Sequence, residues 1–405
     1  MALTIILEFA TTARNFEVIN TIRQNCYGII RCMDSLQMYR YFGSVKTTRE
    51  HNGYIHSVGR ALTIVILGTL CGLTSIEEIH QWAKSQVART FLSEHFGILS
   101  IPSSVWLKEL LSIVDPKSLN HLFTLWTRKQ LPAFLDGLTI AFDGKTMRST
   151  GNMGEYDKPL HVLSAYLADY GLTLSQQTVD EKSNEIPAMR ELLGLIDVRG
   201  CMVVADALHC QTDTAATILH NGADYLLNVK GNQATLENDI EGYVQDEILR
   251  SNMATETTKE KNGGRIEVRQ AFVCHDVSWM GEHLSKWLGL TCFGAINRQF
   301  TSNRKTTNEW HYYISSRVLT PGQLLQFARN EWSIESMHWL LDVQLGEDSC
   351  RIRDINSNQN MNIIRKLALN HLRSFKNSSG SKLPFSRLMF ACLLDCNFIC
   401  EIMNW

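Results

Sequence analysis

The chain has 405 residues, of which 44% are hydrophobic and 20% charged, and its formal net charge is −2 at pH 7. This length and hydrophobic content predict a globular protein of two or three domains and exclude a disordered or fibrous one. A net charge this close to zero also excludes a globally basic nucleic-acid binder, so any such binding must come from local patches.

Eleven cysteines are spread through the chain with irregular spacing and without a CxxC pair. This pattern argues against both a disulfide framework and a zinc ribbon. The amino terminus lacks the positive region of a signal peptide and reaches Glu8 early. The apolar run from Ala61 to Leu73 is shorter than the roughly 18 to 20 residues that cross a bilayer, so it is predicted to be a buried helix. We therefore expect a cytoplasmic protein with no membrane partner.

Residues 1–131 are predicted to form a helical amino-terminal domain. Ser75 and Glu78 resemble a helix start, and apolar residues then recur with helical spacing as far as Val87. A second helix is predicted over Val105–Val114, and Pro116 ends it. The pattern slightly favours a plain helical bundle over a module that binds DNA ends.

From residue 132 to residue 233 the pattern changes to three strands, a helix, a strand, a helix and a strand. The strands are predicted at Leu138–Asp143, Leu160–Ala168, Leu172–Val179, Cys201–Asp206 and Asp224–Val229, and the helices at Ile186–Ile196 and Asp213–His220. This order, with an aspartate at the end of the first and fourth strands, predicts an α/β fold with a ribonuclease H-like core and a mixed sheet.

Residues 234–320 contain several stretches that alternate like strands, separated by polar clusters. An irregular loop of this length is improbable in a compact domain, so a β-rich insertion is predicted. Residues 321–405 are predicted to form a helix that returns to the core, followed by a helical carboxyl end. The segment from Arg351 to Arg387 contains eight basic residues and one acid, Asp354. It forms either a phosphate-binding patch or an ordinary solvated surface.

Three acidic residues stand out from this pattern. Asp143 and Asp206 each end an apolar strand, and Glu335 lies in an aromatic-flanked helical stretch. An isolated buried charge costs several kcal/mol or more, roughly, so such carboxylates must be paired, hydrogen-bonded or metal-bound. Taken singly, each aspartate also fits a turn or a helix cap, and Glu335 fits a solvated helix residue. Their joint occurrence in this order favours a divalent-metal site.

Metal sites made of carboxylates suit phosphodiester chemistry. Two divalent ions roughly 4 Å apart activate the attacking oxygen and stabilise the leaving one. Mg²⁺ and Mn²⁺ prefer oxygen ligands, which fits acids rather than Cys or His.

Spacing alone does not choose among Glu331, Glu335 and Asp342 as the third ligand, because all three can share one helical face. His209 and His338 could assist proton transfer, although a structural role is commoner for a histidine.

Ordered motifs run through the chain from about Tyr41 to Arg373. They are Phe142–Lys145, Val179–Ile186, Asp224–Gln233, Gly264–Glu267, Trp332–Glu335, Leu341–Val343 and Gly346–Asp348. Together they resemble the motifs of the H-repeat-associated, ISAs-type insertion-sequence transposases. This resemblance implies DNA transposition by a DDE mechanism, in which metal ions support strand cleavage and transfer at the ends of the element. It also implies that Asp143, Asp206 and Glu335 bind Mg²⁺ or Mn²⁺, as two ions.

The expected partners are double-stranded DNA, both element ends and target, and a second copy of the chain on that DNA. The amino-terminal domain would then engage the DNA ends. Ten basic residues are expected DNA contacts, although each also fits a plain surface charge: Lys145, Arg148, Lys182, Lys230, Arg265, Arg351, Arg353, Arg365, Lys366 and Arg373.

Some positions depart from the family pattern. Ala207–Gln211 differs from the usual sequence after the second acid, Gly263 replaces a usual His, and Glu331 replaces a usual basic residue or His. Two alternatives therefore remain beside an active transposase. One is a catalytically inactive DNA-binding remnant, and the other is a metal-dependent nuclease without strand transfer.

Overall fold

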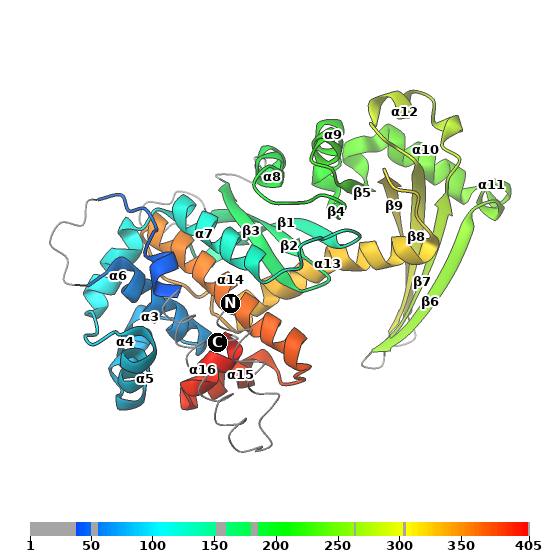
Figure 1. The fold of residues 1–405 in the computed structure, drawn as a ribbon. Coiled ribbons are helices and arrows are strands. Elements are labelled where there is room, and N and C mark those ends of the chain that lie inside the picture. Colours follow the sequence, from blue (N-terminus) through cyan, green and yellow to red (C-terminus); the bar gives the residue numbers. More distant parts are fainter. Residues whose placement is uncertain are drawn as a thin grey trace, which may run out of the picture. The chain divides into compact units, whose positions relative to one another are not determined.

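The structure is a computed structural model that describes residues 38–49, 56–150, 159–179, 185–262, 265–302 and 305–403 (Figure 1). The chain forms two compact units, one of Met1–Leu122 with Asn356–Trp405 and the other of Phe123–Ile355. Within the described ranges, no helix combines the length and the apolar character that crossing a membrane requires.

The described part of the first unit is mainly helical. Its helices are α3 (Val58–Leu70), α4 (Ile76–Lys84), α5 (Gln86–Phe96), α6 (Ser104–Ile113), the start of α7 (Pro116–Lys129), α14 (Ile355–Ser379), α15 (Phe385–Leu394) and α16 (Asn397–Ile402). Helix α3 is buried, as its apolar sequence predicted, and Ser75 and Glu78 form a capping box at the start of α4. The side-chain amide of Asn360 on α14 donates to the carbonyl oxygens of Leu111 and Val114, which ties α14 to the end of α6.

The second unit is built on one mixed sheet. Its strands are β1 (Thr139–Met147), β2 (Leu160–Leu167), β3 (Leu172–Val179), β4 (Met202–Ala205), β5 (Asp224–Val229), β6 (Ala254–Asn262), β7 (Arg265–Cys274), β8 (Cys292–Ser302) and β9 (Lys305–Ser315). Their order in the sheet is β3-β2-β1-β4-β5-β9-β8-β7-β6. Strands β1, β4 and β5 are parallel, and the other neighbours are antiparallel. This confirms the predicted α/β fold with a mixed sheet.

The strands of the segment 234–320 continue the core sheet. Strand β9 pairs antiparallel with β5, with Leu226 opposite Ser315 and Val229 opposite Tyr312. Strands β8, β7 and β6 follow as antiparallel neighbours. The segment is β-rich, as expected, and it reaches the core by extending the edge that β5 would otherwise leave unpaired. The boundaries of the four domains expected from the sequence stay predictions.

Helices cover both faces of this sheet (Figure 1). They are α8 (Glu185–Leu193), α9 (Thr212–His220), α10 (Ala234–Gln245), α11 (Glu247–Ser251), α12 (Glu282–Lys286) and α13 (Pro321–Val343). Helices α8, α9 and α10 lie on one face, where Met189 and Ile218 join Ile140 and Val203 in the main hydrophobic core. The long helix α13 lies on the opposite face and contacts β1 and β4. This leaves the middle of β1 and the end of β4 between the main core and α13.

Candidate active site

Asp143 and Asp206 lie at the same edge of the sheet because they follow paired positions on neighbouring parallel strands. Phe142 on β1 pairs with Ala205 on β4, and the next residue of each segment is an aspartate. Phe142 and Ala205 belong to the main core on the α8 and α9 face. Successive side chains of an extended strand point to opposite faces. Both aspartates are therefore directed toward the face on which α13 lies.

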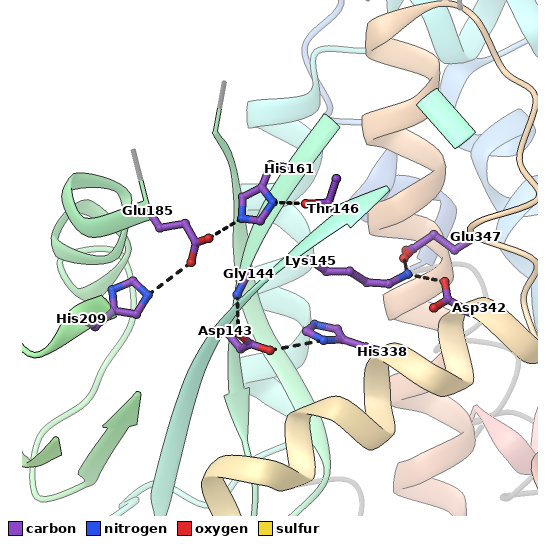
Figure 2. Close-up of polar contacts among 10 residues, drawn as sticks. All are labelled: Asp143, Gly144, Lys145, Thr146, His161, Glu185, His209, His338, Asp342 and Glu347. Carbon is purple, nitrogen blue, oxygen red and sulfur yellow. Dashed lines mark hydrogen bonds and ion pairs between the residues drawn. The ribbon is translucent and has the colours of Figure 1, made fainter. Parts of the chain in front are cut away.

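Each aspartate also accepts a hydrogen bond from a backbone N–H group close to it in the chain. Asp143 Oδ1 accepts a hydrogen bond from the backbone N–H of Gly144 at 2.9 Å (Figure 2). Asp206 Oδ1 accepts one from Leu208 N–H at 3.0 Å and so caps the short helix η3 (Ala207–His209). Asp206 thus has the cap role considered from the sequence, whereas Asp143 begins no turn, because β1 continues through Gly144 to Met147. These hydrogen bonds coexist with a site role because a carboxylate has two oxygens and several acceptor positions.

Helix α13 brings further polar side chains to this edge. His338 Nδ1 lies 3.5 Å from Asp143 Oδ2 (Figure 2). Glu335 is exposed, whereas Glu331, one helical turn earlier, is half-buried. The charge of Glu335 acts on both Asp143 and Glu331. The structure thus places the third expected acid near the first, with Glu331 as a further member of the group.

The carboxylates of this group repel one another. Burial, followed by the charges of Asp206 and Glu185, raises the pKa of Asp143 to about 7. Burial, followed by the charge of Asp206, raises the pKa of Glu331 to about 8, although Lys230 acts in the opposite direction. A divalent cation would relieve such repulsion, because it favours the ionised form of every carboxylate around it.

By their chemistry these side chains fit a divalent ion. Asp143, Asp206, Glu331 and Glu335 all offer carboxylate oxygens, which Mg²⁺ and Mn²⁺ prefer as ligands. In the described part of the chain, the present side-chain positions bring no three His, Cys, Asp or Glu residues close enough together to hold one ion. An ion that binds here would therefore have to draw the repelling carboxylates together.

Lys145 lies two residues beyond Asp143 and has carboxylate partners. Its Nζ pairs with Asp342 and with Glu347 (Figure 2). The same Nζ lies 3.8 Å from Asp348 Oδ1. Glu347 is fully buried, so its charge requires a partner inside the protein. The sequence suggested Lys145 as a phosphate contact. In the structure its charge instead holds the end of α13 and the following turn against β1.

The other expected DNA contacts differ in exposure. Arg148, Lys230, Arg351 and Arg353 are exposed, and Arg373 is half-buried. Arg365 and Lys366 keep only 1% and 2% of their surface exposed, which is incompatible with reaching a DNA backbone from this fold. Their place on α14 explains the error, because the sequence does not show which face of that helix is covered. Lys182 and the side chain of Arg265 lie outside the described residues.

Two residues that sequence reasoning left without a role lie beside the aspartates. Glu185 and His161 are buried, and His161 Nε2 lies 2.6 Å from Glu185 Oε1. His209, three residues after Asp206, is buried near the same carboxylate. Glu185 could have been noticed from the sequence, because it belongs to the motif Val179–Ile186. His161 gave no signal, because it stands in an ordinary apolar strand.

A cavity of about 300 Å³ lies between α13 and strands β7, β8 and β9. It is lined by Arg269, Arg298, Arg329 and Trp332, among others, and the Arg298 guanidinium lies 4.6 Å from the centre of the Trp332 ring. Glu267 pairs with both Arg269 and Arg298, so part of this positive charge is balanced. No sequence pattern indicated the cavity, because its lining comes from three strands and a helix far apart in the chain.

Comparisons with known proteins agree with the motifs. Residues 135–371 match the family described as Transposase DDE domain, and residues 39–127 match the DDE_Tnp_1-associated family. The chain is 31% identical over 355 residues to the putative protein YbfL of Escherichia coli (strain K12), and 30% identical over 355 residues to the H repeat-associated putative transposase YhhI of the same strain. Each alignment covers 86% of this chain and 92% of the relative.

A solved cryo-EM structure of a piggyBac transposase synaptic complex with hairpin DNA aligns with 93% of this chain and 80% of that chain. The TM-score is 0.46 and the identity 10%, so this likeness carries no argument. The family match, in contrast, covers more than half of the chain, and the relatives are similar over most of their length. The chain therefore belongs to the DDE transposase family, with H repeat-associated transposases among its relatives.

Proposed function

We propose that this DDE transposase cleaves DNA strands and joins them at the ends of a mobile element, and that Asp143, Asp206 and Glu335 hold the metal ions it uses. The observation that carries the proposal is the convergence at the sheet edge. Two aspartates follow paired positions of parallel strands and are directed toward the helix that bears Glu335. The raised pKa of Asp143 supports it, because Asp206 and Glu335 contribute to that shift.

When bound, two divalent ions would stabilise the attacking and leaving oxygens of the phosphodiester. The side chains of the protein prepare the site for them. Asp143 presents its oxygens from the middle of β1 and Asp206 from just beyond β4, and the hydrogen bonds that they accept from Gly144 and Leu208 orient the carboxylates. Glu335 lies on an exposed part of α13 and can approach from the helix side. Mg²⁺ or Mn²⁺ as the ion, and two as their number, are part of this proposal.

Double-stranded DNA is the proposed substrate. Arg148 and Lys230 are exposed on the unit that carries the acids, and Arg351 and Arg353 are exposed in the segment between α13 and α14. Positive charges such as these position a DNA backbone without selecting its sequence. Lys182, Arg265 and Arg373 remain proposed contacts. The homodimer on DNA and the cytoplasmic location also stay predictions.

The proposal is tested with purified protein, DNA that carries the element's own ends, and Mn²⁺. Asp143→Asn and Asp206→Asn should each abolish nicking at the ends, and should also abolish the rise in melting temperature that Mn²⁺ causes. Asp213→Asn is the matched control, because Asp213 is an exposed aspartate on α9, on the opposite face of the sheet. Equal metal-induced stabilisation in the parent and both aspartate variants would show that the site lies elsewhere.

The third ligand needs a test of its own. Glu335→Gln should leave DNA binding intact and remove nicking, because Glu335 stands at the acid position of the family motif. Glu331→Gln should keep most activity, because the family usually has a basic residue or His at that position. The reverse result would make Glu331 the third ligand. Parent protein that binds ends without nicking them would instead support the inactive remnant, and nicking without joining would support the nuclease.

A further inference from the structure

A buried polar network connects three elements behind the aspartates. Glu185 begins α8, His161 lies on β2, and His209 ends η3. All three are buried, with 2%, 4% and 0% of their surface exposed. A carboxylate buried to this degree needs polar or charged partners inside the protein. The two imidazoles are those partners.

The distances define the network (Figure 2). His161 Nε2 lies 2.6 Å from Glu185 Oε1, and His161 Nδ1 lies 2.8 Å from Thr146 Oγ1. The other oxygen of Glu185, Oε2, lies 3.4 Å from His209 Nε2. One carboxylate therefore joins β2, through His161, to the segment that follows β4, through His209. Thr146 extends the network back to β1.

The network touches the backbone of both aspartates. Gly144, which follows Asp143, packs directly against it: a Cβ atom at Gly144 would lie 2.6 Å from the Glu185 carboxylate and would clash with the His161 ring. On the other side, His209 closes the short helix η3, which Asp206 caps. Glu185 is thus a common support for the two segments that carry the metal-binding aspartates.

In the metal-free protein, the contacts of Glu185 oppose the separation of the segments that carry Asp143 and Asp206. Asp143 and Asp206 repel each other, so without an ion their segments would tend to move apart. The buried contacts of Glu185 resist this movement, because separating the carboxylate from His161 and His209 would leave its charge without these partners at low dielectric. Burial alone would raise the pKa of Glu185, but His161 and His209 outweigh it and lower this pKa to about 2. Glu185 is therefore ionised throughout the working range of pH.

We propose that Glu185 is a positioning residue of the metal site: by bridging His161 and His209, it holds the segments that carry Asp143 and Asp206 close enough for an ion to draw their carboxylates together. This inference rests on the proposed metal site at Asp143 and Asp206. It assigns Glu185 no contact with metal or DNA. Its effect is to keep the aspartates from separating before an ion binds.

The test measures Mn²⁺ affinity by calorimetry, without DNA, together with the melting temperature in EDTA. Glu185→Gln removes the charge and should weaken Mn²⁺ binding by roughly 10- to 100-fold, the range found when groups that orient metal ligands are changed. Glu185→Asp keeps the charge but shortens the reach, so it should fail in the same way. The matched control is Glu191→Gln on the same helix, where the carboxylate accepts a hydrogen bond from Gln177 at an exposed position. The control should bind Mn²⁺ like the parent.

Two outcomes would overturn the inference. Parent-like Mn²⁺ affinity in both Glu185 variants would exclude any role in the site. Parent-like affinity in Glu185→Asp alone would show that only the charge matters and that no bridge is needed. If the Glu185 variants do not fold, Thr146→Val replaces them, because Thr146 is exposed and holds only His161 Nδ1. That variant should bind Mn²⁺ several-fold more weakly, and unchanged affinity would reject the bridge.

The aspartate variants separate this inference from the proposed function. If Asp143→Asn and Asp206→Asn bind Mn²⁺ like the parent, or the parent binds none, the proposed metal site itself fails. If the aspartate variants lose Mn²⁺ while the Glu185 variants keep it, the site stands and only the positioning role fails.

Discussion

At the scale of single residues, the raised pKa of Asp143 makes the stability of the metal-free protein depend on pH. In unfolded chains this carboxyl ionises near 3.8, and in the folded protein near 7. Well below pH 3.8 it is protonated in both states. As the pH rises from 3.8 to about 7, the unfolded chain loses its proton and the folded protein retains it. Asp143 therefore lowers the free energy of unfolding across this window, and the loss is complete above pH 7.

We expect Asp143→Asn to stabilise the metal-free protein at pH 8 by about 1 to 3 kcal/mol, since one pKa unit corresponds to about 1.4 kcal/mol and the side chain keeps some solvent contact. The gain should shrink as the pH falls toward 3.8, because the unfolded parent then also becomes protonated at this position. Urea titrations in EDTA at pH 4.5, 6 and 8 measure it, with Asp213→Asn as the control. A gain that is the same at all three pH values would contradict the shifted pKa.

At the scale of elements, the position of α13 decides whether the third acid reaches the aspartates. Three contacts fix this helix along β1. Asn330 Nδ2 donates to Thr139 Oγ1 at 2.7 Å, His338 lies by Asp143, and Lys145 pairs with Asp342. They are spread along both elements, so α13 cannot rotate about its axis without breaking them. This arrangement keeps the Glu335 turn facing the site.

Lys145 should be the strongest of these contacts. Lys145→Met removes the cation that pairs with the buried Glu347, and breaking a buried ion pair in this way typically costs about 3 to 5 kcal/mol. We expect a matching fall in the free energy of unfolding, measured by urea denaturation. Lys286→Met is the control, because Lys286 pairs with Glu282 on an exposed helix surface, where such pairs contribute about 0 to 1 kcal/mol. A loss no larger than that of the control would show that the pair contributes little to stability, and would leave the phosphate contact suggested by the sequence open.

At the scale of the whole molecule, a chain with a net charge of −2 must bind DNA through local patches. The exposed pair Arg351 and Arg353 should contact phosphates, and each neutralised phosphate adds roughly 0.9 to the slope of log affinity against log salt. The double change of both to Ala should reduce this slope by up to about 2, measured by fluorescence anisotropy between 50 and 200 mM salt. The control is Arg199→Ala, because Arg199 is highly exposed and already paired with Asp197. An unchanged slope would make the pair a plain surface charge.

The sequence by itself determined the fold class and the family. Alternating and helical patterns gave the strands of the core, and the observed order β3-β2-β1-β4-β5 agrees with them. These features are local: strand periodicity, turns and helix caps depend on neighbours a few residues apart. The motifs around Asp143 and Glu335 were likewise readable as short stretches, and they led to the family that the comparisons confirmed.

Only the tertiary structure decided which side chains meet. It paired Lys145 with acids almost 200 residues away, placed Glu185 between two histidines from other elements, and buried Arg365 and Lys366. Charge and spacing cannot reveal this, because a basic residue on a helix looks the same whether its face is covered or open. Burial and pairing follow from how distant elements pack, and that packing sets the cost of each charge. Local sequence patterns were therefore sufficient to identify the family. The residues that position the candidate site could not be identified in this way, because they depend on contacts between elements far apart in the chain.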